Sequence, residues 1–68
     1  METELILALE TEMTSLKAFG SDVYDHELTI EYLKTGVLPV HKDDIENYEI
    51  LDSAVNDLEQ LKKDYIAS

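Results

Sequence analysis

The chain has 68 residues and carries sixteen Asp and Glu against five Lys and no Arg, which gives a formal net charge of −11 at pH 7. Nucleic acids and anionic membrane surfaces bind proteins through Lys and Arg, so this charge makes direct binding to either of them unfavourable. The length fits one acidic helical domain, residues 1–68, and without cysteine no disulfide can supplement a core that is barely sufficient at this size.

Residues 2–18 are predicted to form the first helix. Ile6, Leu9, Met13 and Leu16 recur at spacings of three and four residues, which places them on one side of a helix. Gly20 is expected to end the helix just beyond its last turn, because glycine readily adopts the left-handed conformation found at helix C-termini.

Residues 22–35 are predicted to form a second helix that is apolar on two sides. One side carries Val23, His26, Ile30 and Leu33, and the other carries Tyr24, Leu28 and Tyr32. Such a helix is either central in the fold or uses one side against another chain. A strand over residues 28–33, which are rich in β-forming types, is the alternative. The helix is preferred because a lone strand in so short a chain has no strand to pair with.

Residues 43–67 are predicted to form one long helix after a connector that contains Pro39, with Asp43 or Asp44 as its cap. Its apolar stripe consists of Tyr48, Ile50, Leu51, Ala54, Val55, Leu58, Leu61 and Tyr65. The predicted fold is therefore all-α: a small three-helix bundle with two shorter helices and a long C-terminal one. The stripe is longer than either preceding helix can cover, so we expect self-association, most simply as a homodimer.

No pattern in the sequence indicates a catalytic, metal or cofactor site. His26 with Asp22, and with Asp25 or Glu27, would supply too few of the His and Cys ligands that zinc sites usually hold. Three short helices also leave little volume for the desolvated pocket that a catalytic carboxylate requires. We therefore expect a protein that is not an enzyme and that binds no metal and no cofactor.

The surplus of carboxylates predicts a binding surface for a basic protein. The residues expected to form it lie mainly on the outward side of the last helix: Asp43, Asp44, Glu46, Glu49, Asp52, Asp57, Glu59 and Asp64. Rows of carboxylates on a helix can imitate the charge spacing of a phosphate backbone, so the partner could itself be a nucleic-acid-binding protein, recruited rapidly and in a salt-sensitive way. Small phage-encoded inhibitors offer an analogy of size and charge.

An alternative function is assembly through an apolar, tyrosine-containing ridge. Its residues would be Tyr24, Leu28, Tyr32, Val37 and Leu38, which would dock a partner helix or a second copy of the chain, while the carboxylates would only keep the protein in solution.

The sequence also indicates where in the cell the protein is expected. No apolar run approaches the length of about 18 residues needed to cross a bilayer. The first residues include Glu2 and Glu4, where a secretory signal would carry Lys or Arg. We expect a cytoplasmic protein, located in the host cytoplasm if a phage encodes it.

Overall fold

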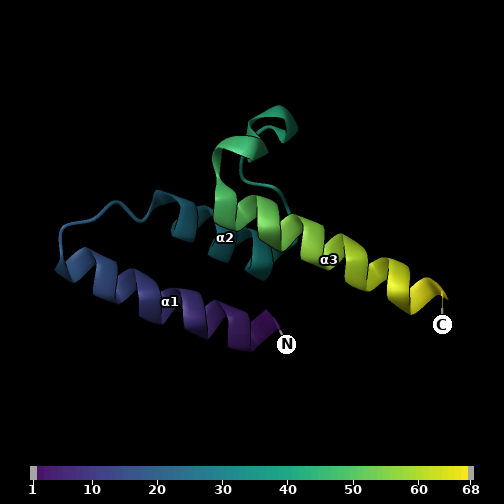
Figure 1. Ribbon diagram of the computed structural model, residues 1–68, viewed down its shortest axis with the longest axis horizontal. Coiled ribbons are helices and arrows are strands. Elements are labelled where there is room, and N and C mark those ends of the chain that lie inside the picture. Colours follow the sequence, from purple (N-terminus) through teal and green to yellow (C-terminus); the bar gives the residue numbers. More distant parts are fainter. Residues whose placement is uncertain (1, 68) are drawn as a thin grey trace.

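The computed structural model describes the backbone of residues 2–67 and the side chains of residues 3–61, 63 and 64. Within residues 2–67 the chain is all-helical, as predicted. It forms α1 (Glu2–Ala18), α2 (Tyr24–Thr35), the short 3₁₀-helix η1 (Lys42–Asn47) and α3 (Glu49–Ala67), as Figure 1 shows. The predicted order of two shorter helices and a longer C-terminal one is confirmed, with 17, 12 and 19 residues.

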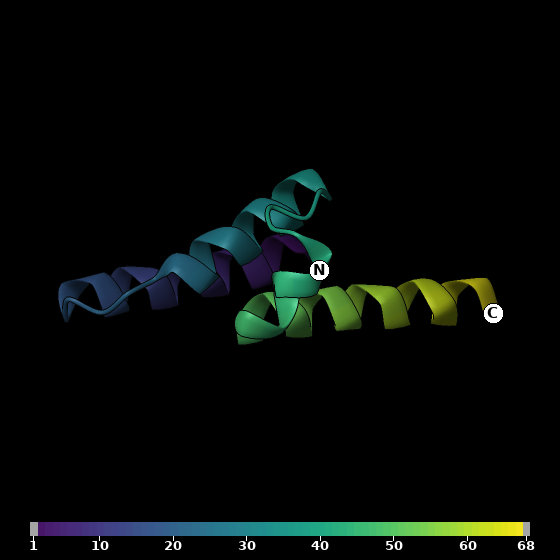
Figure 2. The same ribbon diagram turned by 90° about the horizontal axis from the view of Figure 1, so that it is seen from above.

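The central helix is α2, which packs against both α1 and α3. α1 and α2 run antiparallel, and α3 crosses the other side of α2 and then projects beyond both helices (Figures 1 and 2). In the part of the chain that the structure describes, no Cα atom of α1 lies within 8 Å of one in α3. The backbones of these two helices therefore flank α2 without approaching each other closely, while Leu9 and Ala54 belong to one core cluster.

Glycine ends α1, as predicted, and it also ends α2. Gly20 and Gly36 have φ angles of +76° and +74°, in the left-handed region. After α1, the Ser21 N–H donates to the Leu16 carbonyl oxygen at 2.9 Å, which satisfies an acceptor left free at the end of the helix. After α2, the Gly36 N–H donates to the carbonyl oxygen of Tyr32 at 2.8 Å.

The second predicted element is a helix, and the strand alternative over residues 28–33 is wrong. The helix begins at Tyr24, two residues later than predicted, and the Asp22 carboxylate accepts a hydrogen bond from the Tyr24 N–H at 2.9 Å. Its two apolar sides meet two different neighbours, which is why the residues buried along it are His26, Leu28, Thr29, Ile30 and Leu33.

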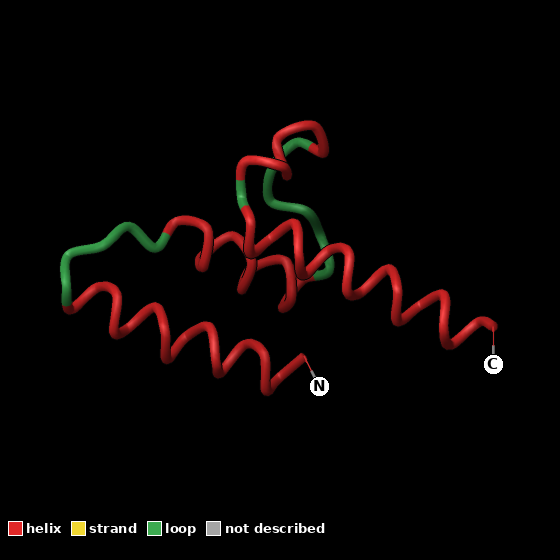
Figure 3. The backbone as a smooth tube through the Cα atoms, viewed as in Figure 1, coloured by secondary structure: helices red, strands yellow, loops and turns green. Residues whose placement is uncertain are grey.

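The prediction of one continuous helix over residues 43–67 is wrong. Residues 42–47 form η1, Tyr48 is extended with φ −125° and ψ 92°, and only then does α3 begin (Figure 3). His41, rather than Asp43 or Asp44, caps η1: its Nδ1 accepts the Asp43 N–H at 3.2 Å.

The core is small and centred on α2. Its main cluster joins Leu9 of α1, Ile30 and Leu33 of α2 and Ala54 of α3. Leu51, at the start of α3, is fully buried. The apolar stripe of α3 is thus covered in its first half, whereas Leu61 is 43% exposed and the Tyr65 side chain lies outside the described residues.

The chain is more open than is usual for its mass. Its accessible surface is 5121 Å², against about 4,400 Å² expected for a compact monomer of 7.8 kDa. Its radius of gyration is 12.8 Å, against about 11 Å expected for this length. The projecting half of α3 and the separation of α1 from α3 explain both differences. None of the helices in the described part of the chain has the length and apolar composition needed to span a membrane.

Candidate functional site

The predicted carboxylates lie on two elements instead of one helix. Seven of the eight are exposed and Asp52 is half-buried. We call the following set the carboxylate surface: Asp43, Asp44 and Glu46 on η1, with Glu49, Asp52, Asp57, Glu59 and Asp64 on α3. Because the chain turns at Tyr48, η1 is set at an angle to α3 (Figure 1).

Four of the five α3 carboxylates form two rows. Asp52 and Glu59 are seven residues apart, as are Asp57 and Asp64, so each pair lies on one line along the helix. At about 100° per residue, the two lines are separated by roughly 140° around the helix axis, and Glu49 lies between them. The carboxylates of α3 are therefore spread across the exposed side of the helix and do not form a single strip.

Few cations offset these charges. Among the side chains that the structure describes, no Lys ammonium lies within 4.0 Å of a carboxylate. The recorded ion-pair contacts involve histidine, at 3.5 Å between His41 Nδ1 and Asp43 Oδ2 and at 3.5 Å between His26 Nε2 and Glu12 Oε1. Within the α3 rows, the Gln60 side-chain amide donates a hydrogen bond to the Asp64 carboxylate at 3.0 Å. The field of the carboxylate surface is thus directed largely into solvent.

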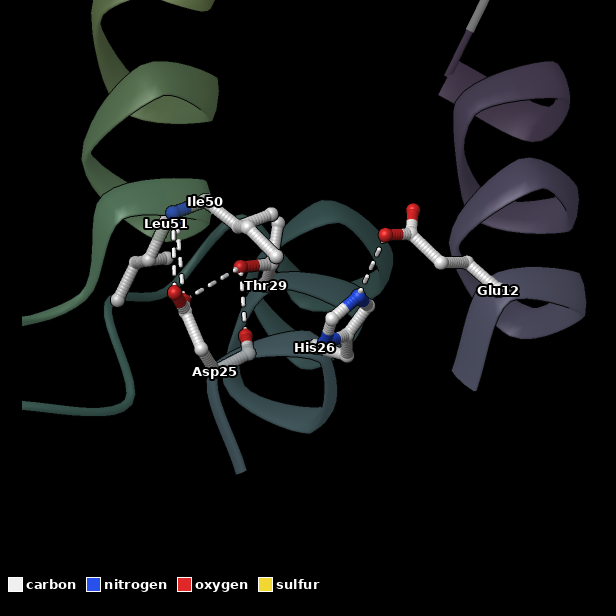
Figure 4. A network of polar contacts seen from close by, with 6 residues as sticks. All are labelled: Glu12, Asp25, His26, Thr29, Ile50 and Leu51. Atoms are coloured by element: carbon white, nitrogen blue, oxygen red, sulfur yellow. Dashed lines mark hydrogen bonds and ion pairs between the residues drawn. The ribbon is translucent and has the colours of Figure 1, made fainter. Parts of the chain in front are cut away.

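A second polar cluster joins α2 to the start of α3. Asp25, in the first turn of α2, accepts hydrogen bonds from the backbone N–H groups of Ile50 at 3.0 Å and Leu51 at 3.2 Å (Figure 4). The Thr29 hydroxyl donates to the Asp25 carbonyl oxygen at 2.8 Å and lies 3.5 Å from its carboxylate. Sequence reasoning missed this contact, because Asp25 is 25 residues from the backbone that it caps.

His26 belongs to the packing between α1 and α2. Its side chain is 8% exposed and points toward Glu12 of α1 (Figure 4). Its Nε2 atom is buried with no hydrogen-bond partner. No group of three or more His, Cys, Asp or Glu within the described residues is arranged to hold a metal ion. Glu12 is thus the carboxylate that the fold places beside His26, whereas Asp25 turns toward α3.

The predicted apolar ridge is divided by the fold. Leu28 is only 6% exposed, because it is covered within the chain itself. Tyr32 is half-buried against the core cluster, and Leu38 is half-buried in the connector. Tyr24 and Val37 remain 50% and 67% exposed, and the Tyr24 ring packs at 5.7 Å and 57° against Tyr48. The residues available to another chain are therefore Tyr24 and Val37 more than Leu28.

An apolar hollow that the sequence did not predict lies between α1 and α3. Its volume is about 320 Å³. Its lining consists of Leu5 and Leu9 of α1, Thr29 of α2, and Glu49, Ile50, Ser53 and Ala54 of α3. It forms because both outer helices pack on α2 while their backbones stay apart.

Comparisons of the chain with protein-family models, curated proteins and solved structures find no match.

Proposed function

We propose that this chain is a small non-enzymatic protein that binds a basic protein through its carboxylate surface. The supporting observation is the concentration of exposed, uncompensated carboxylates on η1 and α3 in a chain of net charge −11. Like charges repel one another and lower the stability of a small fold. The same field accelerates the association of a protein of opposite charge, which gives the carboxylates a role that helix stability alone would not explain.

A nucleic-acid-binding protein is the partner class that we propose, with inhibition as the outcome. Carboxylates seven residues apart on a helix are separated by about 10.5 Å along its axis. Along the axis of duplex DNA, the phosphates of one strand follow one another at about 3.4 Å, so this axial distance equals roughly three such steps. A protein that binds phosphates with Lys and Arg could therefore accept α3 in their place, and it would then be blocked from its nucleic acid.

The test compares two variants with the same change in charge. The first neutralises part of the carboxylate surface: Glu49→Gln, Asp52→Asn and Glu59→Gln. The control neutralises three exposed carboxylates elsewhere: Glu4→Gln, Glu27→Gln and Glu31→Gln. Each protein is immobilised, exposed to a native lysate and eluted with stepwise salt, and captured proteins are identified by mass spectrometry.

We expect a basic protein to be retained by the wild type and by the control, and lost from the first variant. It should elute as salt rises from about 0.05 to 0.5 M, because the screening length falls to a few ångströms. Added duplex DNA should also displace it. Retention by both variants alike, or elution that is independent of salt, would show that the carboxylate surface is not the binding site.

Assembly through apolar side chains is a second candidate function. It is favoured by the exposed Tyr24 and Val37, and by the surface that the chain exposes beyond the value expected for its mass. In this case two copies would form a homodimer, with Leu61 and the projecting half of α3 as part of the contact. A Tyr24→Ser, Val37→Ser variant should then fail to assemble, whereas the carboxylate variant should assemble normally. Light scattering after size exclusion measures both.

A further inference from the structure

The hollow between α1 and α3 has the shape of a groove bordered by two helices. Both helices are held on α2, and the N-terminal half of α1 lies beside the first half of α3 (Figures 1 and 2). Leu9, Thr29 and Ala54 form its floor and are 6%, 0% and 5% exposed. Leu5, which is 41% exposed, forms part of its wall. The groove is thus apolar within and open to solvent.

The α3 edge of the groove is acidic. Glu49 lines the hollow directly. Asp57 follows Ser53 by one turn, so it lies on the same side of α3 as a lining residue. Both carboxylates are exposed. An apolar channel with carboxylates along its α3 edge, in a chain of net charge −11, matches a ligand that is apolar on one side and cationic on its flank.

We infer that this groove docks an amphipathic helix of a basic partner, with Lys or Arg flanking its apolar side. This inference rests on the proposed function and specifies how the partner is recognised. A helix places apolar anchors at i, i+3, i+4 and i+7, which suits a groove between two helices. The volume of about 320 Å³ accommodates one or two large apolar side chains of that helix.

The charge favours this occupant. A second copy of the chain would bring another net charge of −11 to a groove whose α3 edge is already acidic. A cationic helix instead pairs its Lys or Arg with that edge while its anchors fill the apolar floor.

The test uses a defined probe and a matched pair of leucines. The probe is a fluorescently labelled helical peptide of about 18 residues, with Leu along one side and Lys along the other. Its controls are a Leu/Lys peptide of scrambled order and an amphipathic Leu/Glu peptide. Leu5→Ser alters the groove, whereas Leu7→Ser makes the same change at a leucine of α1 that is 58% exposed and does not line the hollow.

We expect the amphipathic Leu/Lys peptide to bind the wild type and Leu7→Ser with similar affinity, and to bind Leu5→Ser about tenfold more weakly. Ser53→Phe, at an exposed position of the hollow, should weaken binding further by filling it. Circular dichroism checks that each variant is folded. Equal affinities for Leu5→Ser and Leu7→Ser, or equal binding of the scrambled peptide, would overturn the inference.

Amide chemical shifts of the ¹⁵N-labelled chain locate the peptide. Shifts centred on residues 5, 9, 50, 53 and 54 support the groove. Shifts confined to η1 and the outer side of α3 overturn it, while the proposed function would stand if the lysate partner remained sensitive to the carboxylate variant. If the groove residues shift on dilution without peptide, a second copy occupies the groove and the inference is wrong.

Discussion

Asp25 supplies through its side chain a cap that the start of α3 lacks in its own sequence. Tyr48 precedes the helix in an extended conformation, and it lacks the short oxygen-bearing side chain with which Ser, Thr, Asp or Asn caps the first free N–H groups. The Asp25 carboxylate reaches the second and third residues of α3 instead, Ile50 and Leu51. These are the N–H groups that a capping side chain normally satisfies, and the negative charge lies at the positive end of the helix dipole.

Replacing Asp25 by Ala is expected to lower the free energy of unfolding by about 1–2 kcal/mol, because two N–H groups lose their acceptor. Asp25→Asn should cost less, since an amide oxygen can still accept. Asp57→Ala, at an exposed position within α3, is the control and should not destabilise the fold. Urea titration followed by circular dichroism measures the three variants. Equal stability of Asp25→Ala and the wild type would show that the contact contributes nothing.

Replacing His26 or His41 by leucine is expected to change the free energy of unfolding in opposite directions. His26 is buried and its Nε2 atom has no hydrogen-bond partner, with Glu12 at 3.5 Å as its charged neighbour, so His26→Leu should raise the unfolding free energy by about 1 kcal/mol by removing a polar group without a hydrogen bond. His41 is exposed and accepts the Asp43 N–H, so His41→Leu should lower it by about 0.5 kcal/mol. Urea titration provides both values. Marked destabilisation by His26→Leu would indicate that its contact with Glu12 stabilises the α1–α2 packing.

At the level of the elements, the glycines that end α1 and α2 are needed for their left-handed backbone conformation and not because space is short. A Cβ atom added at Gly36 would meet no atom within 4 Å, so substitution there is opposed by the φ angle of +74° and not by crowding. Gly36→Ala should therefore cost about 1–2 kcal/mol, and Gly36→Asn less, because Asn tolerates this conformation better. Thermal unfolding by circular dichroism measures the difference. If Ala and Asn proved equally stable, the left-handed end of α2 would not be under strain.

Helix ends that are marked by a residue in the local sequence could be predicted. Gly20 and Gly36 mark the ends of α1 and α2 in the sequence itself, and both ends are found where they were expected. The break between η1 and α3 could not be predicted in this way, because residues 43–67 contain no glycine or proline. The turn at Tyr48 accompanies contacts with Asp25 and Tyr24, which the fold brings to it from α2.

For the whole molecule, composition predicted which groups face solvent but not how they are grouped. Carboxylates avoid burial unless they are paired, so the exposure of residues such as Asp57 and Glu59 follows from their type and spacing. Their division into two rows on α3 and a separate group on η1 depends on where the chain turns. The hollow beside Leu5 depends on how two helices are spaced across a third, which no spacing pattern within one helix reveals.

The net charge of −11 gives salt opposite effects on the two proposed associations. Binding to a basic partner is driven by attraction and should weaken as salt rises from about 0.05 to 0.5 M. Self-association brings together two chains of the same charge, so a homodimer should become tighter over the same range as their repulsion is screened. Light scattering at both salt concentrations checks this: a mass of 7.8 kDa at low salt that doubles at high salt is the expected result for apolar assembly. A particle of 7.8 kDa under both conditions would show that the chain does not self-associate, and any partner of the apolar surface would then be a different protein. A dimer that dissociated as salt rose would contradict the view that charge repulsion dominates between two copies.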